Sequence, residues 1–485
     1  MSSAKATIAP LRGRQNLLFL LGLLLLWPAL LHGDVFGFND TVSYLRGADT
    51  VWAKLTGHSD AFFGNATPAG AQAAPAAPPG MVLYGRSLYF GLFLYLGLLA
   101  KSFWVPVVLQ ALAAGAAIVG MVRHFVDPSD ERAFARTCLA AFALVAVTPL
   151  PFFVCFLMPD LAVGLAIPVA ALLLCRWRFE RARWRAGLLA LLAFAALAHS
   201  TAVAVLGLLA VGGFAAAWRV RSRPVGVAAT ALMATAAIGI GGEALFGLAT
   251  RLTTGSSPVR PPFLTARLIE DGPARRFLAE HCADTRFVQC RYPVLQPVSA
   301  EVFLWEITRP RGGFKALPVA DAIRVSQEQG RFALAVLRAY PTETAAGLGR
   351  DFLRLAGNLE LHDFRPEYLA GRMRADQPFE AMPANTPLPA IDRAISGLTL
   401  VLVLGALAAF PWRRSSPPAD LRAAVWVVLA AIALNDVICA WLSGPFARYN
   451  TRVIWALPLV VLLFRAAAWR SRGAVPRPRA SDTPP

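Results

Sequence analysis

Ten apolar stretches, most of them bordered by arginines, constrain this chain more than any other feature. They cover residues 16–31, 103–122, 133–149, 161–175, 186–198, 201–218, 225–248, 395–410, 423–441 and 453–469. A helix needs about 20 residues to cross a hydrocarbon core of roughly 30 Å. The shorter stretches must therefore borrow flanking residues or thin the bilayer. The pattern predicts an all-α polytopic membrane protein with about ten transmembrane helices.

Composition agrees with this class, and the basic residues orient the chain. Of the 485 residues 56% are hydrophobic, and the net charge is +18. The arginines cluster between apolar stretches, at 123–136, 176–185, 219–223, 413–422 and 465–479. The positive-inside rule explains these clusters, so no nucleic-acid partner is expected. We predict a multi-pass protein of a bacterial inner membrane, with an uncleaved N-terminal signal-anchor and both termini in the cytoplasm.

One further apolar run, residues 83–100, is ambiguous. Counting it as a crossing would turn most arginine clusters outward, against the positive-inside rule. Its aromatic residues suit a helix lying in the membrane interface. We therefore predict that it lies on, or dips into, the outer leaflet.

Four regions follow from this topology. They are an N-terminal transmembrane module at 1–249 with an outer loop at 34–102, an extracytoplasmic segment at 250–394, C-terminal transmembrane helices at 395–470, and a disordered basic cytoplasmic tail at 471–485. The outer loop contains a low-complexity linker at 68–80. The extracytoplasmic segment is mixed but mainly helical, with helices expected at 263–281, broken by Asp271-Gly272-Pro273, and at 321–340 and 344–361. Cys282 and Cys290 flank an expected short strand at 286–289, and we predict a disulfide between them in an oxidising compartment, with two free thiols as the alternative.

Ionisable residues within or beside membrane spans are costly and are functional candidates by default. On this topology seven gather at the outer ends of the spans: Asp34, Asp40, Asp160, His199, Glu243, Asp436 and Arg448. Each also has a structural explanation. Asp40 and Asp160 are placed to cap helices, His199 to occupy a polar turn, Glu243 and Asp436 to hold helices together, and Arg448 to anchor the interface. No Walker loop, GxGxxG, HExxH or GxSxG motif is present in the sequence.

The layout of the first half of the chain resembles the GT-C superfamily of integral membrane glycosyltransferases. The matching features are Asp40-Thr-Val-Ser-Tyr44 after the first span, the interfacial run at 84–101, and Met158-Pro159-Asp160 in the second outer loop. The chain departs from the family at Asn39-Asp40, where a paired acid is usual, and at Gly85-Arg86-Ser87, where a His-Pro-Pro-like sequence is usual. These departures leave the donor class and the dependence on metal open.

The resemblance implies an enzyme that moves a sugar from a polyprenyl-phosphate donor in the membrane to an extracytoplasmic acceptor. Asp40 and Asp160 are the expected catalytic residues, with Asp160 also a candidate ligand for Mg or Mn. Tyr44 and Asp34 are expected to contact substrate. Arg448 and His199 are expected to neutralise the leaving phosphate, because guanidinium–phosphate bonds are charge-assisted.

Two other classes remain open. In a lipid or solute transporter, Glu243 and Asp436 would bind protons or substrate, although the sequence shows no inverted repeat. A non-catalytic membrane assembly protein is the third reading. The sequence does not name the sugar or the acceptor.

Overall fold

The computed structural model describes residues 17–57, 82, 83, 85–179, 181–256, 258–308, 313–361, 388–410 and 419–473. These residues form helices and no strand, and two isolated bridges, Phe36 with Phe156 and Leu83 with Val259, join separate segments. The predicted linker at 68–80 and most of the predicted tail at 471–485 lie outside the described residues. The all-α class is confirmed for the part of the chain that is described.

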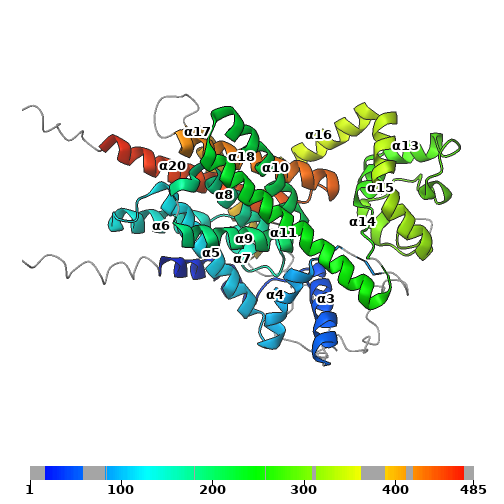
Figure 1. The fold of residues 1–485 in the computed structure, drawn as a ribbon, viewed down its shortest axis with the longest axis horizontal. Coiled ribbons are helices and arrows are strands. Elements are labelled where there is room, and N and C mark those ends of the chain that lie inside the picture. The colour runs from blue at the N-terminus through cyan, green and yellow to red at the C-terminus, as the bar shows by residue number, and fades with distance from the viewer. Residues whose placement is uncertain are drawn as a thin grey trace, which may run out of the picture.

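The apolar stretches form one helical bundle, seen at the left and centre of Figure 1. Its helices are η1 (Leu18–Leu26), α2 (Trp27–His32), α5 (Trp104–Phe125), α6 (Glu131–Ala146), α7 (Leu150–Val154), α8 (Asp160–Arg176), η2 (Trp177–Phe179), α9 (Ala182–Ala198), α10 (Ser200–Val220), α11 (Arg223–Thr254), α17 (Leu388–Ala409), α18 (Ala419–Leu442), α19 (Ala447–Ile454) and α20 (Ala456–Gly473).

Six helical segments of the described chain are long and apolar enough to cross a membrane. They are Trp104–Phe125, Ser200–Val220, Arg223–Thr253, Pro389–Ala409, Asp420–Leu442 and Ala447–Trp469. The chain is therefore a multi-pass membrane protein. The other four predicted spans form shorter helices, among them α6 with 16 residues and α8 and α9 with 17 each. The count of ten crossings stays a prediction.

The backbones of η1 and α5 pack closely against each other. A Cβ on Gly22 would overlap the Ala111 carbonyl oxygen, and a Cβ on Gly115 would overlap that of Phe19. Small residues let helix backbones approach in this way where lipid offers no hydrophobic driving force. The helical run ends at His32, where Gly33 adopts a left-handed φ of 91° and its N–H donates to the Ala29 carbonyl, and the loop that follows begins there.

That loop starts a pair of helices, α3 (Asn39–Thr56) and α4 (Leu88–Leu99), which lie side by side at the lower edge of the bundle in Figure 1. Gly91 of α4 lies against the Tyr44 carbonyl, where a Cβ would not fit. The rings of Tyr44 and Phe90 meet edge to face, with their centroids 5.3 Å apart. With 12 residues, α4 is too short to span the membrane. Its length fits the predicted interfacial helix.

The described residues between α11 and α17, at 258–308 and 313–361, are called the outer segment here. This segment packs around a hydrophobic core of its own at the right of Figure 1. Its helices are α12 (Phe263–Asp271), α13 (Pro273–Glu280), η3 (Val288–Arg291), α14 (Ala300–Trp305), α15 (Val319–Ala339) and α16 (Pro341–Gly357). The expected helix at 263–281 breaks at Gly272, whose φ of +113° suits glycine alone. The core is rich in aromatic contacts, such as the perpendicular rings of Phe277 and Phe332.

The expected strand at 286–289 is wrong, because Val288–Arg291 forms a single 3-10 turn. That turn brings Cys290 back to Cys282, with 5.3 Å between their Cα atoms and a disulfide joining their sulfurs. The bond therefore closes a compact turn rather than a hairpin.

The outer segment is attached to the bundle chiefly through α16, which packs on α18 and α19. The Asn450 amide of α19 donates to the carbonyls of Ala356 (3.1 Å) and Asn358 (3.2 Å), at the end of α16. A second attachment is the Val259 N–H, which donates to the Val82 carbonyl at 2.8 Å. Both attachments lie beside the polar residues described next.

Candidate functional site

Four of the seven polar residues predicted to face outward, Asp40, Asp160, His199 and Arg448, meet at one end of the bundle. With the residues around them they form a group that we call the polar cluster. It comprises Asp40, Tyr44, Arg86, Asp160, His199, Asn435, Cys439, Arg448, Tyr449 and Arg452. Tyr44 interacts electrostatically with Asp40 and Arg86 on one side and with Asp160 and Arg448 on the other. The cluster therefore joins α3 to helices that are more than 100 residues further along the chain.

Asp40 lies in the first turn of α3 and forms an ion pair with Arg86, from the loop before α4. The capping explanation of Asp40 is wrong, because Thr41 holds the start of the helix instead. The Thr41 hydroxyl accepts the Phe38 N–H at 2.9 Å and donates to the Leu157 carbonyl at 3.1 Å. The Asp40 side chain keeps 21% of its surface exposed, so it can be reached by another molecule.

Asp160, the first residue of α8, forms a buried ion pair with Arg452 of α19. Arg452 Nη1 lies 2.8 Å from the carboxylate, and the two side chains are 0% and 2% exposed. Gly164 makes the pair possible, since a Cβ there would overlap the Arg452 carbonyl and push α19 away. The Asp160 carboxylate therefore joins α8 to α19 through its ion pair, and it does not cap α8.

This pairing bears on the metal expected at Asp160. A Mg²⁺ or Mn²⁺ site needs several oxygen ligands around one position. One oxygen of Asp160 is bonded to Arg452, and among the described residues no three or more His, Cys, Asp or Glu side chains are grouped so that they could hold a metal ion. The donor set at Asp160 does not fit a divalent cation, and we derive no chemical step through one.

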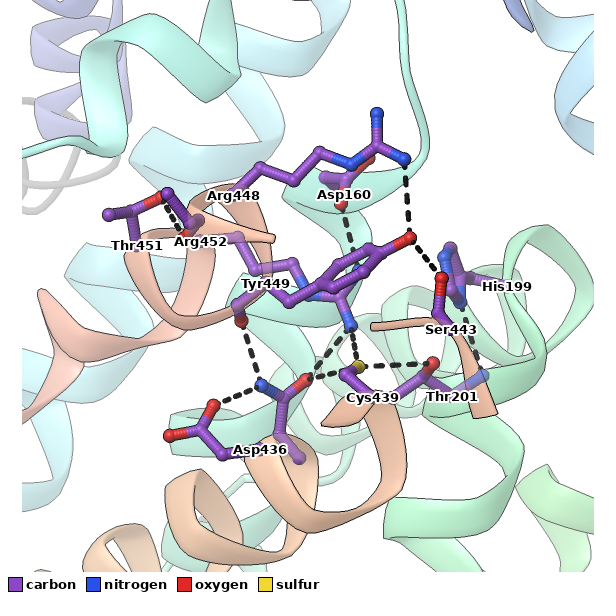
Figure 2. A network of polar contacts seen from close by, with 12 residues as sticks. Asp160, His199, Thr201, Asp436, Cys439, Ser443, Arg448, Tyr449, Thr451 and Arg452 are labelled. Carbon is purple, nitrogen blue, oxygen red and sulfur yellow. Dashed lines mark hydrogen bonds and ion pairs between the residues drawn. The ribbon is translucent and has the colours of Figure 1, made fainter. Parts of the chain in front are cut away.

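Arg448, one turn before Arg452, is half-buried among aromatic rings. Its guanidinium carbon lies 4.4 Å from the centroid of the Phe38 ring and 5.1 Å from that of Tyr449. Its Nη2 donates to the Tyr449 hydroxyl at 3.2 Å, which in turn lies 2.7 Å from Ser443 Oγ (Figure 2). Rings and hydroxyls therefore fix the direction of this guanidinium, which also interacts electrostatically with Asp40 and Asp160.

His199 and Asp34 have more local roles. His199 Nδ1 accepts the Thr201 N–H at 3.1 Å and so caps α10, although the ring also interacts electrostatically with Asp160 and Arg448. Asp34 accepts the N–H of Val35 at 2.7 Å and interacts with His32. None of the contacts described for the polar cluster involves Asp34.

The outlying candidates Glu243 and Asp436 differ from each other. Glu243 forms a half-exposed ion pair with Arg260 of the outer segment, at 2.6 Å, and lies outside the cluster. Asp436 is buried and accepts from the Asn435 amide at 2.9 Å. Asn435 also accepts from Arg452 Nη2, so Asp436 borders the cluster.

Sequence reasoning missed Arg86, Asn435 and Arg452 as members of the site. A signal for Arg452 was present, because residues four apart share one face of a helix and Arg448 was already a candidate. Arg86 was noted only as a departure from the family pattern. The role of Asn435 depends on how α18 packs against α19, which no local pattern reveals.

An apolar cavity of about 270 Å³ lies beside the cluster, between α4, α5, α8 and α9. Its lining is formed by Phe90, Phe93, Leu109, Gln110, Ala113, Leu161, Ala162, Leu165, Leu191 and Phe194. Leu161 directly follows Asp160, and the Phe90 ring meets that of Tyr44 edge to face. The one amide in the lining donates to the carbonyls of Val154 (2.9 Å) and Phe156 (3.1 Å). Charged groups and an apolar cavity are thus neighbours in the same bundle.

The fold and the cluster define a class, that of an all-α multi-pass membrane protein with an arginine-rich polar cluster at one end of its bundle. Comparison with protein-family models, with curated proteins and with solved structures finds no match to this chain. The cluster and the cavity beside it therefore carry any proposal of function.

Proposed function

We propose that this protein is a membrane glycosyltransferase that moves a sugar from a polyprenyl-phosphate donor to an extracytoplasmic acceptor. The observation that carries the proposal is the position of guanidinium groups beside an apolar cavity within one bundle. A polyprenyl phosphate has an anionic head and a hydrocarbon chain, and this arrangement suits both. The sequence resemblance to GT-C enzymes points to the same substrate.

Arg448 binds the phosphate in this proposal. A guanidinium forms short, charge-assisted and bidentate bonds to phosphate oxygens. The rings of Phe38 and Tyr449 hold the group in place, so little side-chain freedom is lost on binding. As the bond between the sugar and the phosphate breaks, Arg448 stabilises the negative charge on the leaving group.

Asp40 is the general base that accepts the proton of the acceptor hydroxyl. Its partial exposure allows approach to within the roughly 3 Å that proton transfer needs. Arg86 orients the carboxylate through the ion pair, and the second carboxylate oxygen turns to the acceptor. Asp160 is a positioning residue, since through Arg452 it holds α19 and therefore Arg448 in place.

We further propose the ten-span topology, with the cluster at the outer face of a bacterial inner membrane and both termini in the cytoplasm. The opposite end of the bundle supports this orientation. There Arg176 pairs with Asp420 at 2.6 Å, and Arg123 and Arg185 stack on Trp184 and Trp177. Tryptophans are enriched at both membrane interfaces, and an excess of arginine marks the cytoplasmic one.

A proton-coupled transporter is the second candidate, and the buried carboxyl of Asp436 is the observation that favours it. The transferase test below separates the two, because a transporter forms no glycan product.

The experiment that tests the transferase replaces Asp40 with asparagine. Asp40→Asn keeps the size of the side chain and leaves the cap at Thr41 intact, but removes the basic oxygen. We expect formation of the glycan product in cells to fall by about 10²-fold at equal protein level, the usual value of a positioned base. Asp34→Asn is the matched control, since it removes a carboxylate from the same loop outside the cluster. Normal product from Asp40→Asn would remove the catalytic assignment.

A further inference from the structure

Asp436 is the buried acid that the proposed reaction does not use. It lies on α18 with a relative exposure of 2%. Within the described residues its carboxylate has one hydrogen bond, from the Asn435 amide, and no ion pair. Three other acids of the bundle, Asp40, Asp160 and Asp420, are each bonded to an arginine.

An ionised carboxylate in such a place is costly. Removing a charge from water without a counter-ion costs far more than burying a neutral polar group, so the group takes up a proton instead. The charged neighbour that faces Asp436 is Arg452 of α19, whose own partner is Asp160 of α8. The thiol of Cys439, on the next turn of α18, lies on the same side as Arg452, at 3.2 Å from its Nη2.

Asn435 connects Asp436 to that arginine. Its Oδ1 accepts from Arg452 Nη2 at 2.9 Å, while its Nδ2 donates to Asp436 and, at 2.8 Å, to the Tyr449 carbonyl. Figure 2 shows Asp436 at the far end of this network from Arg448, with a dashed line to one of its carboxylate oxygens. The charge of Arg452 is thus directed at Asp160 and separated from Asp436 by one amide.

We propose that Asp436 is a proton-binding site coupled to the Arg452–Asp160 pair. It keeps its proton while Arg452 is paired with Asp160, and releases it when Arg452 loses that partner. On release the O–H bond of the carboxylic acid breaks, the proton passes to water, and the carboxylate becomes the counter-ion of Arg452. Linkage is reciprocal, so removing the proton from Asp436 weakens the hold of Arg452 on Asp160 by the same free energy.

This proposal is independent of the transferase. A glycosyltransferase and a transporter could both contain such a site, and the test reads the carboxyl itself rather than product.

Infrared spectroscopy distinguishes a carboxylic acid from a carboxylate through its carbonyl stretch. The full-length protein, with ¹³C-labelled aspartate, is measured in detergent at about pH 7, where ordinary aspartates are ionised. We expect the wild type to show a protonated carbonyl band that shifts in D₂O and is lost in Asp436→Asn. A wild-type spectrum without that band, or a band that persists in Asp436→Asn, would overturn the proton site.

The coupling has a separate readout. In Asp160→Asn the arginine loses its carboxylate, and we expect the Asp436 band to fall by about twofold or more as Asp436 ionises beside Arg452. Asp420→Asn is the matched control. It breaks a different ion pair of α8, the one between Arg176 and Asp420 of α18, at the opposite end of the bundle. An unchanged band in Asp160→Asn, or an equal fall in Asp420→Asn, would overturn the coupling while leaving the wild-type result intact.

Discussion

Arg452 in the bundle and Arg267 in the outer segment are both buried and both form ion pairs. They differ in the number of carboxylates around them. Arg267, 4% exposed, forms ion pairs with Glu270, Asp271 and Asp351. Arg452, 0% exposed, has Asp160 as its ion-pair partner within the described chain, supplemented by an amide and a thiol.

The difference shows what each cluster can accept. Around Arg267 the surplus is negative, and burial together with the neighbouring Asp351 and Glu270 raises the pKa of Asp271 to about 6, against the effect of Arg267. That surplus is relieved by a proton. In the polar cluster the three guanidinium groups of Arg86, Arg448 and Arg452 lie with the two carboxylates of Asp40 and Asp160, so the cluster as a whole suits an anion such as the proposed phosphate. A buried ion pair is therefore not itself a sign of a binding site, but the sign of the unmatched charge is informative.

The largest expected effect comes from removing Arg452. Arg452→Met leaves Asp160 as an uncompensated buried charge, and we expect the free energy of unfolding to fall by about 3–5 kcal/mol. The double variant Asp160→Leu/Arg452→Met removes both charges and should recover most of the loss. Thermal unfolding in detergent measures both. A single variant as stable as the wild type would mean that the pair carries no structural role and that the comparison with Arg267 fails.

A smaller effect is expected at Arg448. Arg448→Lys keeps the charge but loses the planar fork and the stacking on Phe38, and we expect transfer to fall by about 10-fold, mostly as a higher KM for the donor. The measurement is product formation at several donor concentrations. Arg185→Lys, which alters an arginine stacked on Trp177 at the other end of the bundle, should transfer normally. Equal losses in both variants would show that stacking matters but phosphate binding does not.

The smallest expected effect is the pH dependence of the outer segment. The folded pKa of Asp271, about 6, lies above the value near 3.9 of an unfolded aspartate. Its contribution is thus fully present below about pH 4 and is lost as the pH rises through about 6. Allowing for solvent screening, we expect a loss on the order of 1 kcal/mol. Unfolding measured by proteolysis of the outer segment should weaken over this range in the wild type and remain flat in Asp271→Asn. Parallel curves for the two proteins would contradict the protonation of Asp271.

The sequence predicted the helices of the bundle, and which residues lie near one another in the site, better than it predicted the contacts between those residues. Apolar stretches located the helices of the bundle, and the positive-inside rule put Asp40, Asp160 and Arg448 at the same end. Which carboxylate meets which arginine depends on how closely α19 crosses α8 at Gly164, and that is a property of packing. The capping role assigned to Asp40 failed because α3 begins at Asn39, one residue before Asp40, which places Asp40 inside the first turn, where its carboxylate pairs with Arg86.

The short-range error at 286–289 has a similar cause. The Phe-Val-Gln run favours a strand by composition. The chain instead turns tightly within a 3-10 helix that places Cys290 beside Cys282. A covalent constraint of this kind overrides local propensity.

The hydrogen bond between Val259 and Val82 has a consequence for how such a protein can change by recombination. It joins the outer segment to the short stretch before α4, and that stretch supplies Arg86 to Asp40. A chimaera that exchanged residues 258–361 alone would keep this bond, and with it the position of Arg86, only if the new segment placed a backbone N–H opposite the Val82 carbonyl. The segment that recombination can exchange without disturbing the Asp40–Arg86 pair is therefore discontinuous. It comprises the outer segment together with residues 82–87.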